Sequence, residues 1–233
     1  MKRGQALWLA IAGLALLLAI VVIGALGGWR GILQKPAAPV VAISVPTDAV
    51  DPLNEGRLVS VQGNLESTRP PLDENLDIVA HDAVVLIREV EMYQWQESCI
   101  GDSCAQSPVW SSTLIDTEGF HEKKDHANPA GFPFASARFE AQGIHLGAFE
   151  PDLDLILAQV PPVARPLRVS ELPANLAASA SEIDGHIHVG NDPLQPAIGD
   201  LRISYQVVPA TTTILEGIQQ GNRLVAANRR NPM

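Results

Sequence analysis

The chain has 233 residues, of which 46% are hydrophobic, and its formal net charge at pH 7 is −10. All 26 acidic residues lie from Asp48 onward, together with only 12 of the 16 basic residues. This acidic part repels phosphate groups, which argues against nucleic acid as a partner and against adhesion to anionic lipid. Its about 185 residues are enough to bury a core of their own.

The N-terminal segment is apolar enough to cross a membrane. Residues 6–26 contain no charged side chain, and about 21 residues at about 1.5 Å rise span the about 30 Å of a bilayer core. Trp8 and Trp29 lie near its two ends, where interfacial aromatic residues are common. We therefore expect a cytoplasmic N-terminus at 1–5 and a transmembrane anchor at 6–28. A cleaved signal peptide is the alternative, because the segment also begins with a basic n-region.

A Pro-rich stretch follows the apolar segment. Residues 29–53 mix prolines with small residues and show no sustained hydrophobic period, which is typical of a stalk. We expect order to begin near Asn54, a β-rich extracytoplasmic domain at 54–215, and a polar C-terminal tail at 216–233.

Strands dominate the elements expected in the domain. Residues 57–65 alternate as a strand does, and residues 83–97 are long, rich in β-branched and aromatic side chains, and free of Gly and Pro. Residues 109–116 are expected to return beside 83–97 as a hairpin. Short helices are predicted from about Pro151 and at 169–177. Further strands are expected around 137–139, 143–146, 201–209, 211–215 and 223–226, which gives a β-rich α+β fold.

Two cysteines, Cys99 and Cys104, enclose a segment with Gly101 and Asp102, residues that suit a tight turn. A disulfide across so short a loop contributes about 2 kcal/mol in the chain-entropy model and indicates an oxidising compartment. Two free thiols, or a redox or metal role, remain the alternatives. Two cysteines alone cannot complete a structural zinc site.

Candidate metal ligands are present but weakly patterned. His121, Asp125 and His126 lie in a polar loop near Asp116 and Glu118, and such loops collect these residues because they are solvated. His186 and His188 share one face of an extended segment, with Asp184 or Asp192 as a further ligand. We expect no metal and no cofactor.

Signs of catalysis are equally sparse. The sequence contains no G-x-S-x-G, Walker or G-x-G-x-x-G motif. Glu89 and Glu91 fall on one face of the strand expected at 83–97, away from Arg88, and a carboxylate pair can do acid–base work. A solvated edge or an ion pair explains them more simply, so we expect no enzyme. The alternative is a membrane-tethered, metal-dependent hydrolase that uses this pair or the loop histidines.

Four motifs together resemble the transmembrane protein 43 (LUMA-like) family. They are N-E-G-R-L-V at 54–59, E-M-Y-Q-W-Q-E at 91–97, H-A-N-P at 126–129 with Phe132-Pro133, and G-D-L-R at 199–202. The resemblance covers about 54 to 209, and the second motif is its specific part. It implies an N-terminal membrane span, a large domain in the lumen or periplasm, and further membrane helices near the C-terminus. The animal member is associated with the endoplasmic reticulum and inner nuclear envelope as a self-associating scaffold, and the family pattern includes no catalytic residues.

The C-terminus departs from that pattern, because residues 219–233 are polar and contain no second apolar span. We expect a bacterial, C-terminally shortened member of the family or a fragment of a longer gene product.

These observations predict a single-pass protein of the cell inner membrane, with most of the chain in the periplasm. Its expected function is that of a non-enzymatic scaffold that forms homo-oligomers or binds other envelope membrane proteins. A small-ligand or glycan-binding module with Trp95 or Trp110 as stacking platform is a further alternative. The residues expected at the interface or in the core are Glu91, Met92, Tyr93, Trp95 and Glu97.

Overall fold

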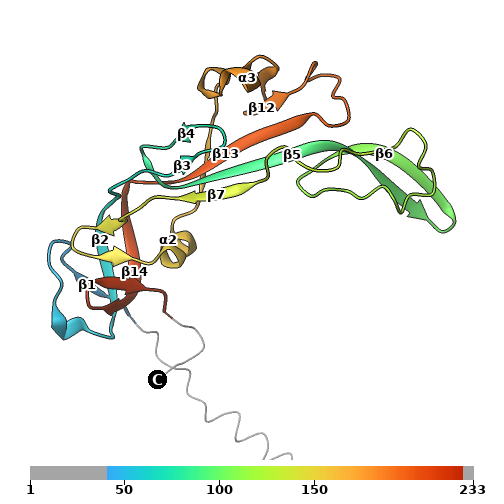
Figure 1. The fold of residues 1–233 in the computed structure, drawn as a ribbon. Helices are drawn as coiled ribbons and strands as arrows, with labels where there is room; N and C mark the ends of the chain where they lie inside the picture. The colour runs from blue at the N-terminus through green and yellow to red at the C-terminus, as the bar shows by residue number, and fades with distance from the viewer. Residues whose placement is uncertain (1–40, 228–233) are drawn as a thin grey trace, which may run out of the picture. The chain divides into compact units, whose positions relative to one another are not determined.

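Two main sheets contain most strands of residues 41–227, the part of the chain that the computed structural model describes (Figure 1). The helices in this part are few and short, which confirms the prediction of a β-rich domain. The predicted anchor at 6–28 lies outside the described residues. Within residues 41–227, no helix has the length and apolar character needed to cross a membrane.

The first sheet has the order β1-β2-β14-β15-β9, and β8 pairs with β2. Helix α2 (Leu153–Gln159) contacts β14 and β15 and buries Leu155 and Ile156. Gly217 of β14 allows this approach, because a Cβ atom there would lie 2.9 Å from Cδ2 of Leu155. The strands are β1 (Ile43–Val45), β2 (Leu58–Glu66), β8 (His145–Leu146), β9 (Glu150–Pro151), β14 (Thr212–Gln220) and β15 (Arg223–Val225).

The second sheet has the order β11-β12-β13-β5-β6, and β10 and β7 pair with β13 and β5. Its strands are β5 (Ala83–Ile100), β6 (Ser103–Ser111), β7 (Ala137–Glu140), β10 (Val163–Arg165), β11 (Ala180–Ile183), β12 (His186–Val189) and β13 (Leu201–Pro209). The remaining elements are a small hairpin of β3 (Leu72–Asp73) and β4 (Ile78–Val79), helix α3 (Ala174–Ala177), and the 3-10 turns η1 (Pro52–Asn54) and η2 (Val169–Glu171).

Strand β5 belongs both to the core and to a projecting hairpin. Its first half pairs with β13 up to Met92, and its second half pairs with β6 from Met92 to Ile100. From Val84 to Gln94 every even-numbered side chain is buried, whereas Glu89 is exposed and the odd-numbered residues that follow it are partly exposed. This period of two confirms the predicted strand.

The hairpin partner of β5 starts earlier in the chain than predicted. We expected it at 109–116, but β6 occupies Ser103–Ser111. The first half of β6 is rich in small polar residues, which have weak strand propensity, so sequence patterning missed it. Gly101 and Asp102 form a two-residue turn, in which Gly101 has a φ of 60°. This tight turn imposes strand pairing from Ser103 onward.

Two expected boundaries also differ from the structure. Strand β14 continues to Gln220, inside the segment predicted as a polar tail, and β15 at Arg223–Val225 confirms the strand expected at 223–226. The end of β14 was missed because buried Gln219 takes a position that a hydrophobic side chain would otherwise mark. Its amide donates to the carbonyl of Asp51 at 2.8 Å. Strand β1 pairs in parallel with β2, so regular structure begins within the predicted stalk, before Asn54.

Candidate functional site on the β5–β6 arm

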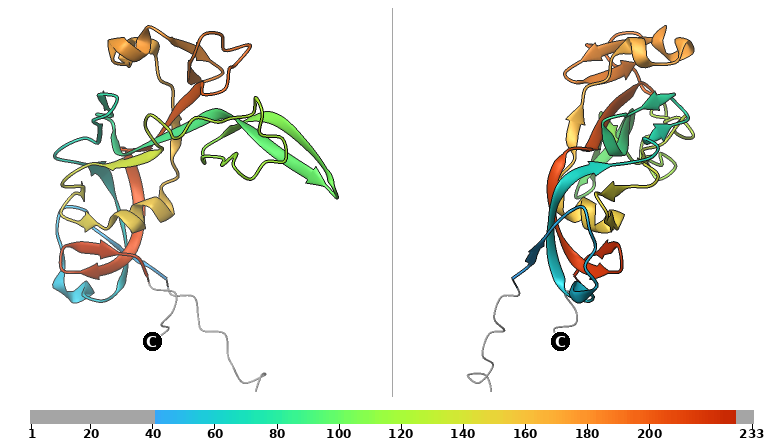
Figure 2. Two further views of the ribbon diagram at one scale, coloured as in Figure 1. Left: turned by 45° about the vertical axis from the view of Figure 1, so that its right-hand side comes forward. Right: turned by 90° about the vertical axis from the view of Figure 1, so that its left-hand side faces the viewer.

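The second half of β5, the turn and β6 form a hairpin, residues 92–111, that we call the arm. It extends beyond the strands that flank the first half of β5, as Figure 1 and the left view of Figure 2 show. Its pairing runs without a bulge from Met92↔Ser111 to Ile100↔Ser103. Ile100 beside the turn is 89% exposed. The arm therefore carries a large apolar side chain to its tip.

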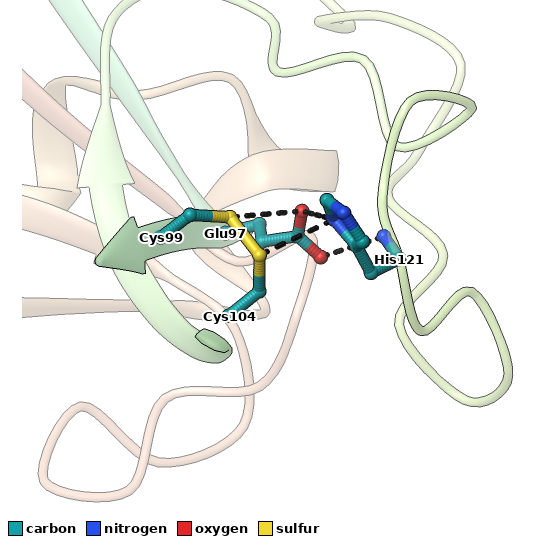
Figure 3. A group of neighbouring side chains, drawn as sticks. All are labelled: Glu97, Cys99, Cys104 and His121. Atoms are coloured by element: carbon teal, nitrogen blue, oxygen red, sulfur yellow. Dashed lines mark hydrogen bonds and ion pairs between the residues drawn. A yellow bond between two sulfur atoms is a disulfide. The ribbon is translucent and has the colours of Figure 1, made fainter. Parts of the chain in front are cut away.

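A disulfide joins the two strands next to this turn. Cys99 and Cys104 lie directly opposite each other, with an S–S distance of 2.05 Å and a Cα–Cα distance of 4.1 Å. The bond is shown in Figure 3. The pairing expected for the two cysteines is thus the one that the structure contains.

The edge of β5 that faces away from β6 is covered by side chains and loops. Asn128 accepts a hydrogen bond from the N–H of Trp95 at 2.7 Å and donates to its carbonyl at 2.9 Å. Tyr93 donates its N–H to the carbonyl of Asp200 at 2.8 Å and accepts from the N–H of Gly199 at 2.9 Å. These contacts satisfy polar backbone groups that an open strand edge would leave free.

The loop that follows β6 is fastened to the arm by two polar side chains of β5. The buried amide of Gln94 accepts from the N–H of Ile115 at 2.9 Å and donates to the carbonyl of Thr113 at 3.1 Å. Glu97 accepts from the N–H of His121 at 2.8 Å and from the amide of Gln106 at 2.6 Å, and its second oxygen lies 2.8 Å from His121 Nδ1. The hydrogen bonds from His121, followed by the one from Gln106, lower the pKa of Glu97.

The partly exposed face of the arm is aromatic at its root. The rings of Tyr93 and Trp110 lie 5.0 Å apart, and the guanidinium of Arg202 lies 4.1 Å from the Trp110 ring centroid. Arg202 is also 4.0 Å from the carboxylate of Glu91. Farther out, Trp95 meets the ring of His126 edge to face at 4.5 Å. Stacking and cation–π contacts of this kind hold aromatic side chains in fixed orientations.

Met92 points to the opposite face and is buried. It packs with Val90 and Leu201, and the partly buried Phe132 and Phe134 lie against this cluster. Of the five residues predicted at an interface or in the core, Met92 is therefore a core residue. The other four are partly buried on the outward face of β5: Glu91 lies just before the arm, and Tyr93, Trp95 and Glu97 lie on it.

A buried charge network lies beneath the root of the arm. Arg88 forms an ion pair with Asp73 at 2.5 Å, with both side chains almost fully buried, and Tyr205 donates to the same carboxylate. Burial and this hydrogen bond raise the pKa of Tyr205. Arg88 also donates to the carbonyl of Ala135. The network links β3, β5 and β13 to the segment before β7, so it fixes the base from which the arm extends.

Most predicted metal ligands are not brought together. His121 contacts Glu97, whereas His126 lies against Trp95. Buried His188 lies 3.1 Å from a carboxylate oxygen of Asp200, and neighbouring His186 has a pKa lowered by burial and by Arg202. The two loop histidines, His121 and His126, and the two histidines of β12, His186 and His188, are thus engaged in separate contacts within the protein.

The predicted acid–base pair lies at the surface. Glu89 and Glu91 line a pocket of about 180 Å³ together with His186, Arg202 and Ser204. The same two carboxylates also line a second hollow of about 520 Å³ with Ile87, Ser112 and Ser136. Arg202 faces Glu91 across the strand pair, in agreement with the expected ion pair.

Three of the four motifs that resembled a known family meet at the arm; the motif at 54–59 lies in the first sheet, at η1 and the start of β2. Residues 91–97 form its inner strand, Asn128 from 126–129 covers the edge of that strand, and the segment 199–202 lies beside Tyr93. Sequence alone could not show this proximity, because the three segments are far apart in the chain. Together they define a β-rich domain with a projecting, disulfide-tipped hairpin.

Comparison with known proteins identifies the family of this domain. The family model described as Transmembrane protein 43 matches residues 92–231, and the chain belongs to this family of membrane proteins. It is 27% identical over 192 residues to the Transmembrane protein 43 homolog of Drosophila melanogaster, covering 73% of this chain and 48% of the relative. Human Transmembrane protein 43 is 28% identical over 199 residues, with 76% and 49% covered. The chain therefore spans about half the length of these relatives. No solved structure matches it.

Proposed function

We propose that this chain is a membrane-anchored, non-enzymatic interaction protein of the cell envelope that self-associates through the arm. Its membership in a family of membrane proteins supports the anchor. The disulfide between Cys99 and Cys104 supports an oxidising compartment. In this proposal the anchor crosses the inner membrane once and the β-rich domain lies in the periplasm.

The observation that carries the proposal is the composition of the arm surface. Tyr93, Trp95 and Trp110 are each partly exposed on one face, with Arg202 beside them. Tyr, Trp and Arg are the side chains most enriched where interfaces derive their binding energy. The contacts of Gln94 and Asn128 hold this face rigid, which reduces the entropy lost on binding.

Association through side chains fits the arm better than extension of its sheet. Trp95 pairs with Pro108, and the backbone groups of Trp95 point away from β6 toward Asn128. Two residues directly opposite each other in an antiparallel pair point their backbone groups either toward each other or both outward. Because those of Trp95 point outward, the nitrogen of Pro108 also points away from β5, to the outer edge of β6. A proline there interrupts the donors that a further strand would need. The partner surface is therefore the aromatic face and the tip.

The test is the oligomeric state of the full-length chain in detergent, measured by light scattering during size-exclusion chromatography. We expect the wild type to exceed the mass of a monomer and Ile100→Arg at the tip to raise the dissociation constant at least about tenfold, a change of about 1.4 kcal/mol. Leu194→Arg is the matched control, because Leu194 is 80% exposed outside the arm. It should leave the oligomer unchanged.

Two results would reject this function. A wild type that stays monomeric at all concentrations excludes self-association. Equal weakening by Ile100→Arg and Leu194→Arg would show that the arm is not the interface. Circular dichroism of both variants should match that of the wild type, because each replaces a side chain that is at least 80% exposed.

A further inference from the structure

Four side chains with metal-ligating atoms meet at the tip of the arm (Figure 3). Glu97 and Cys99 come from β5, Cys104 comes from β6, and His121 comes from the loop after β6. One ligand atom from each lies within 4.8 Å of all the others. Within residues 41–227, no other group of three or more His, Cys, Asp and Glu side chains has its ligand atoms this close together.

The distances in the cluster are close to those of a zinc site. Cys104 Sγ lies 3.3 Å from His121 Nδ1, and Cys99 Sγ lies 3.6 Å from a carboxylate oxygen of Glu97. The same oxygen lies 2.8 Å from His121 Nδ1. Ligand atoms around a tetrahedral Zn²⁺, at bond lengths of about 2.0 to 2.3 Å, are about 3.3 to 3.8 Å apart. The imidazole nitrogen and the carboxylate oxygen would have to move apart to reach this range. The two sulfur atoms, bonded to each other, are much too close until the disulfide is reduced.

We propose that reduction of the Cys99–Cys104 disulfide turns the tip of the arm into a Zn²⁺ site with Glu97 and His121 as its other ligands. Two thiolates, an imidazole and a carboxylate are donors that zinc accepts in a four-coordinate site. The sequence had suggested His121 as a metal ligand together with Asp125 and His126, but not with the cysteines, because 16 residues separate it from Cys104. Glu97 places it there through bonds to its backbone and ring.

The redox step balances with a thiol reductant. Two thiol groups transfer two electrons to the disulfide, so the S–S bond of the arm breaks and one forms in the reductant. The protons of the reductant pass to Cys99 and Cys104, and Zn²⁺ releases both as it binds the thiolates. The disulfide and the metal are therefore mutually exclusive states of one tip.

The two states hold the loop after β6 differently. In the disulfide state, this loop reaches the tip through hydrogen bonds between His121 and Glu97. In the zinc state, His121 would be a metal ligand and the loop would be fixed to both strands of the arm. This inference concerns the reduced tip and does not depend on the proposed self-association.

Cobalt(II) substitution in the full-length protein tests the proposal. The chain in detergent is reduced with a phosphine, freed of it, and titrated with Co²⁺ without oxygen. We expect one Co²⁺ per chain, with thiolate-to-cobalt charge transfer and tetrahedral ligand-field absorption, and displacement by Zn²⁺. The oxidised protein should show neither absorption.

Two variants separate this site from unspecific binding. His121→Ala should weaken Co²⁺ binding at least about tenfold, because it removes one ligand from an exposed position. His145→Ala is the matched control, since His145 also pairs with a glutamate, Glu66, at 3.3 Å outside the arm. It should bind as the wild type does. A reduced wild type without thiolate charge transfer, equal binding by the oxidised protein, or unchanged affinity of His121→Ala would each overturn the proposal.

Discussion

The side chain of Asn128 pairs with the backbone of Trp95 as a neighbouring strand would. Its oxygen accepts from the Trp95 N–H at 2.7 Å, and its nitrogen donates to the Trp95 carbonyl at 2.9 Å and to that of Ile115 at 3.1 Å. One amide thus covers the edge of β5 and fastens the loop after β6. The orientation of Trp95 on the arm depends on this contact.

Replacement of Asn128 by Ala should therefore destabilise the domain. The variant leaves partly buried backbone groups of Trp95 without partners, so we expect the free energy of unfolding to fall by about 1 to 3 kcal/mol. Urea unfolding measures this change. Asn175→Ala, at an exposed position of α3, should stay within about 0.5 kcal/mol of the wild type. Equal effects of the two variants would contradict the role of Asn128.

The buried ion pair of Asp73 and Arg88 should be far more sensitive than an exposed one. Asp73→Asn leaves the guanidinium of Arg88 buried without a counter-charge, and we expect a loss of about 3 to 5 kcal/mol in thermal or urea unfolding. Glu140→Gln breaks the pair with Arg138, in which both side chains are about half exposed. It should cost at most about 1 kcal/mol. A small effect of Asp73→Asn would show that the network does not stabilise the base of the arm.

The titration of Glu97 should report its contact with His121. The hydrogen bonds from His121 hold the pKa of Glu97 below its ordinary value. A carboxylate with a lowered pKa in the folded state stabilises that state above the ordinary pKa, and the effect is lost as the pH falls through the lowered value. In carbon NMR titrations of the side chain, His121→Ala should raise the pKa of Glu97. His145→Ala should leave it unchanged, and a shift with both variants would contradict the contact.

Loss of the disulfide should weaken the fold by a modest amount. The bond closes a loop of six residues, from Cys99 to Cys104. The chain-entropy model gives about 2 kcal/mol for such a loop. Replacement of both cysteines by Ser, compared with the wild type in urea without metal, should show this loss. Reductant should destabilise the wild type but not the double variant. A reductant effect on both would have another origin.

Pro108 should prevent the outer edge of β6 from pairing with strands of other molecules. Pro108→Val restores an outward N–H in a strand-forming residue, so we expect more thioflavin-positive aggregate at high protein concentration. Ser107→Val is the matched control, because its N–H faces β5 in the alternation that Trp95 and Pro108 define. Aggregation of both variants to the same extent would attribute the effect to hydrophobicity alone.

Sequence patterning predicted the strands whose composition or alternation is distinctive. Strand β5 was found from its length, its β-branched and aromatic residues and its lack of Gly and Pro. Strand β13 was found with its observed bounds, Leu201–Pro209, and its apolar residues recur at every second position from Leu201 to Val207. Where polar residues take inward positions, as Gln219 does in β14, the period was hidden and the boundary was misplaced.

The candidate site was predicted only in part. Residues 91–97 and the cysteine pair were identified from local spacing. The contacts of Glu97 with His121 and of Trp95 with Asn128 join residues 24 and 33 positions apart. Such pairings are set by how the loop after β6 folds back along the arm, which hydrophobic period does not encode.

The continuity of β5 also determines how the arm would respond to force. Its 18 residues contain neither Gly nor Pro, and they extend over about 60 Å from core to tip. A pull at Ile100 along the strand would load the hydrogen bonds to β13 in shear, so many must yield together. A sideways pull on β6 would open its bonds to β5 one pair at a time until the disulfide is reached. The arm thus resists force applied along its length more strongly than force applied across it.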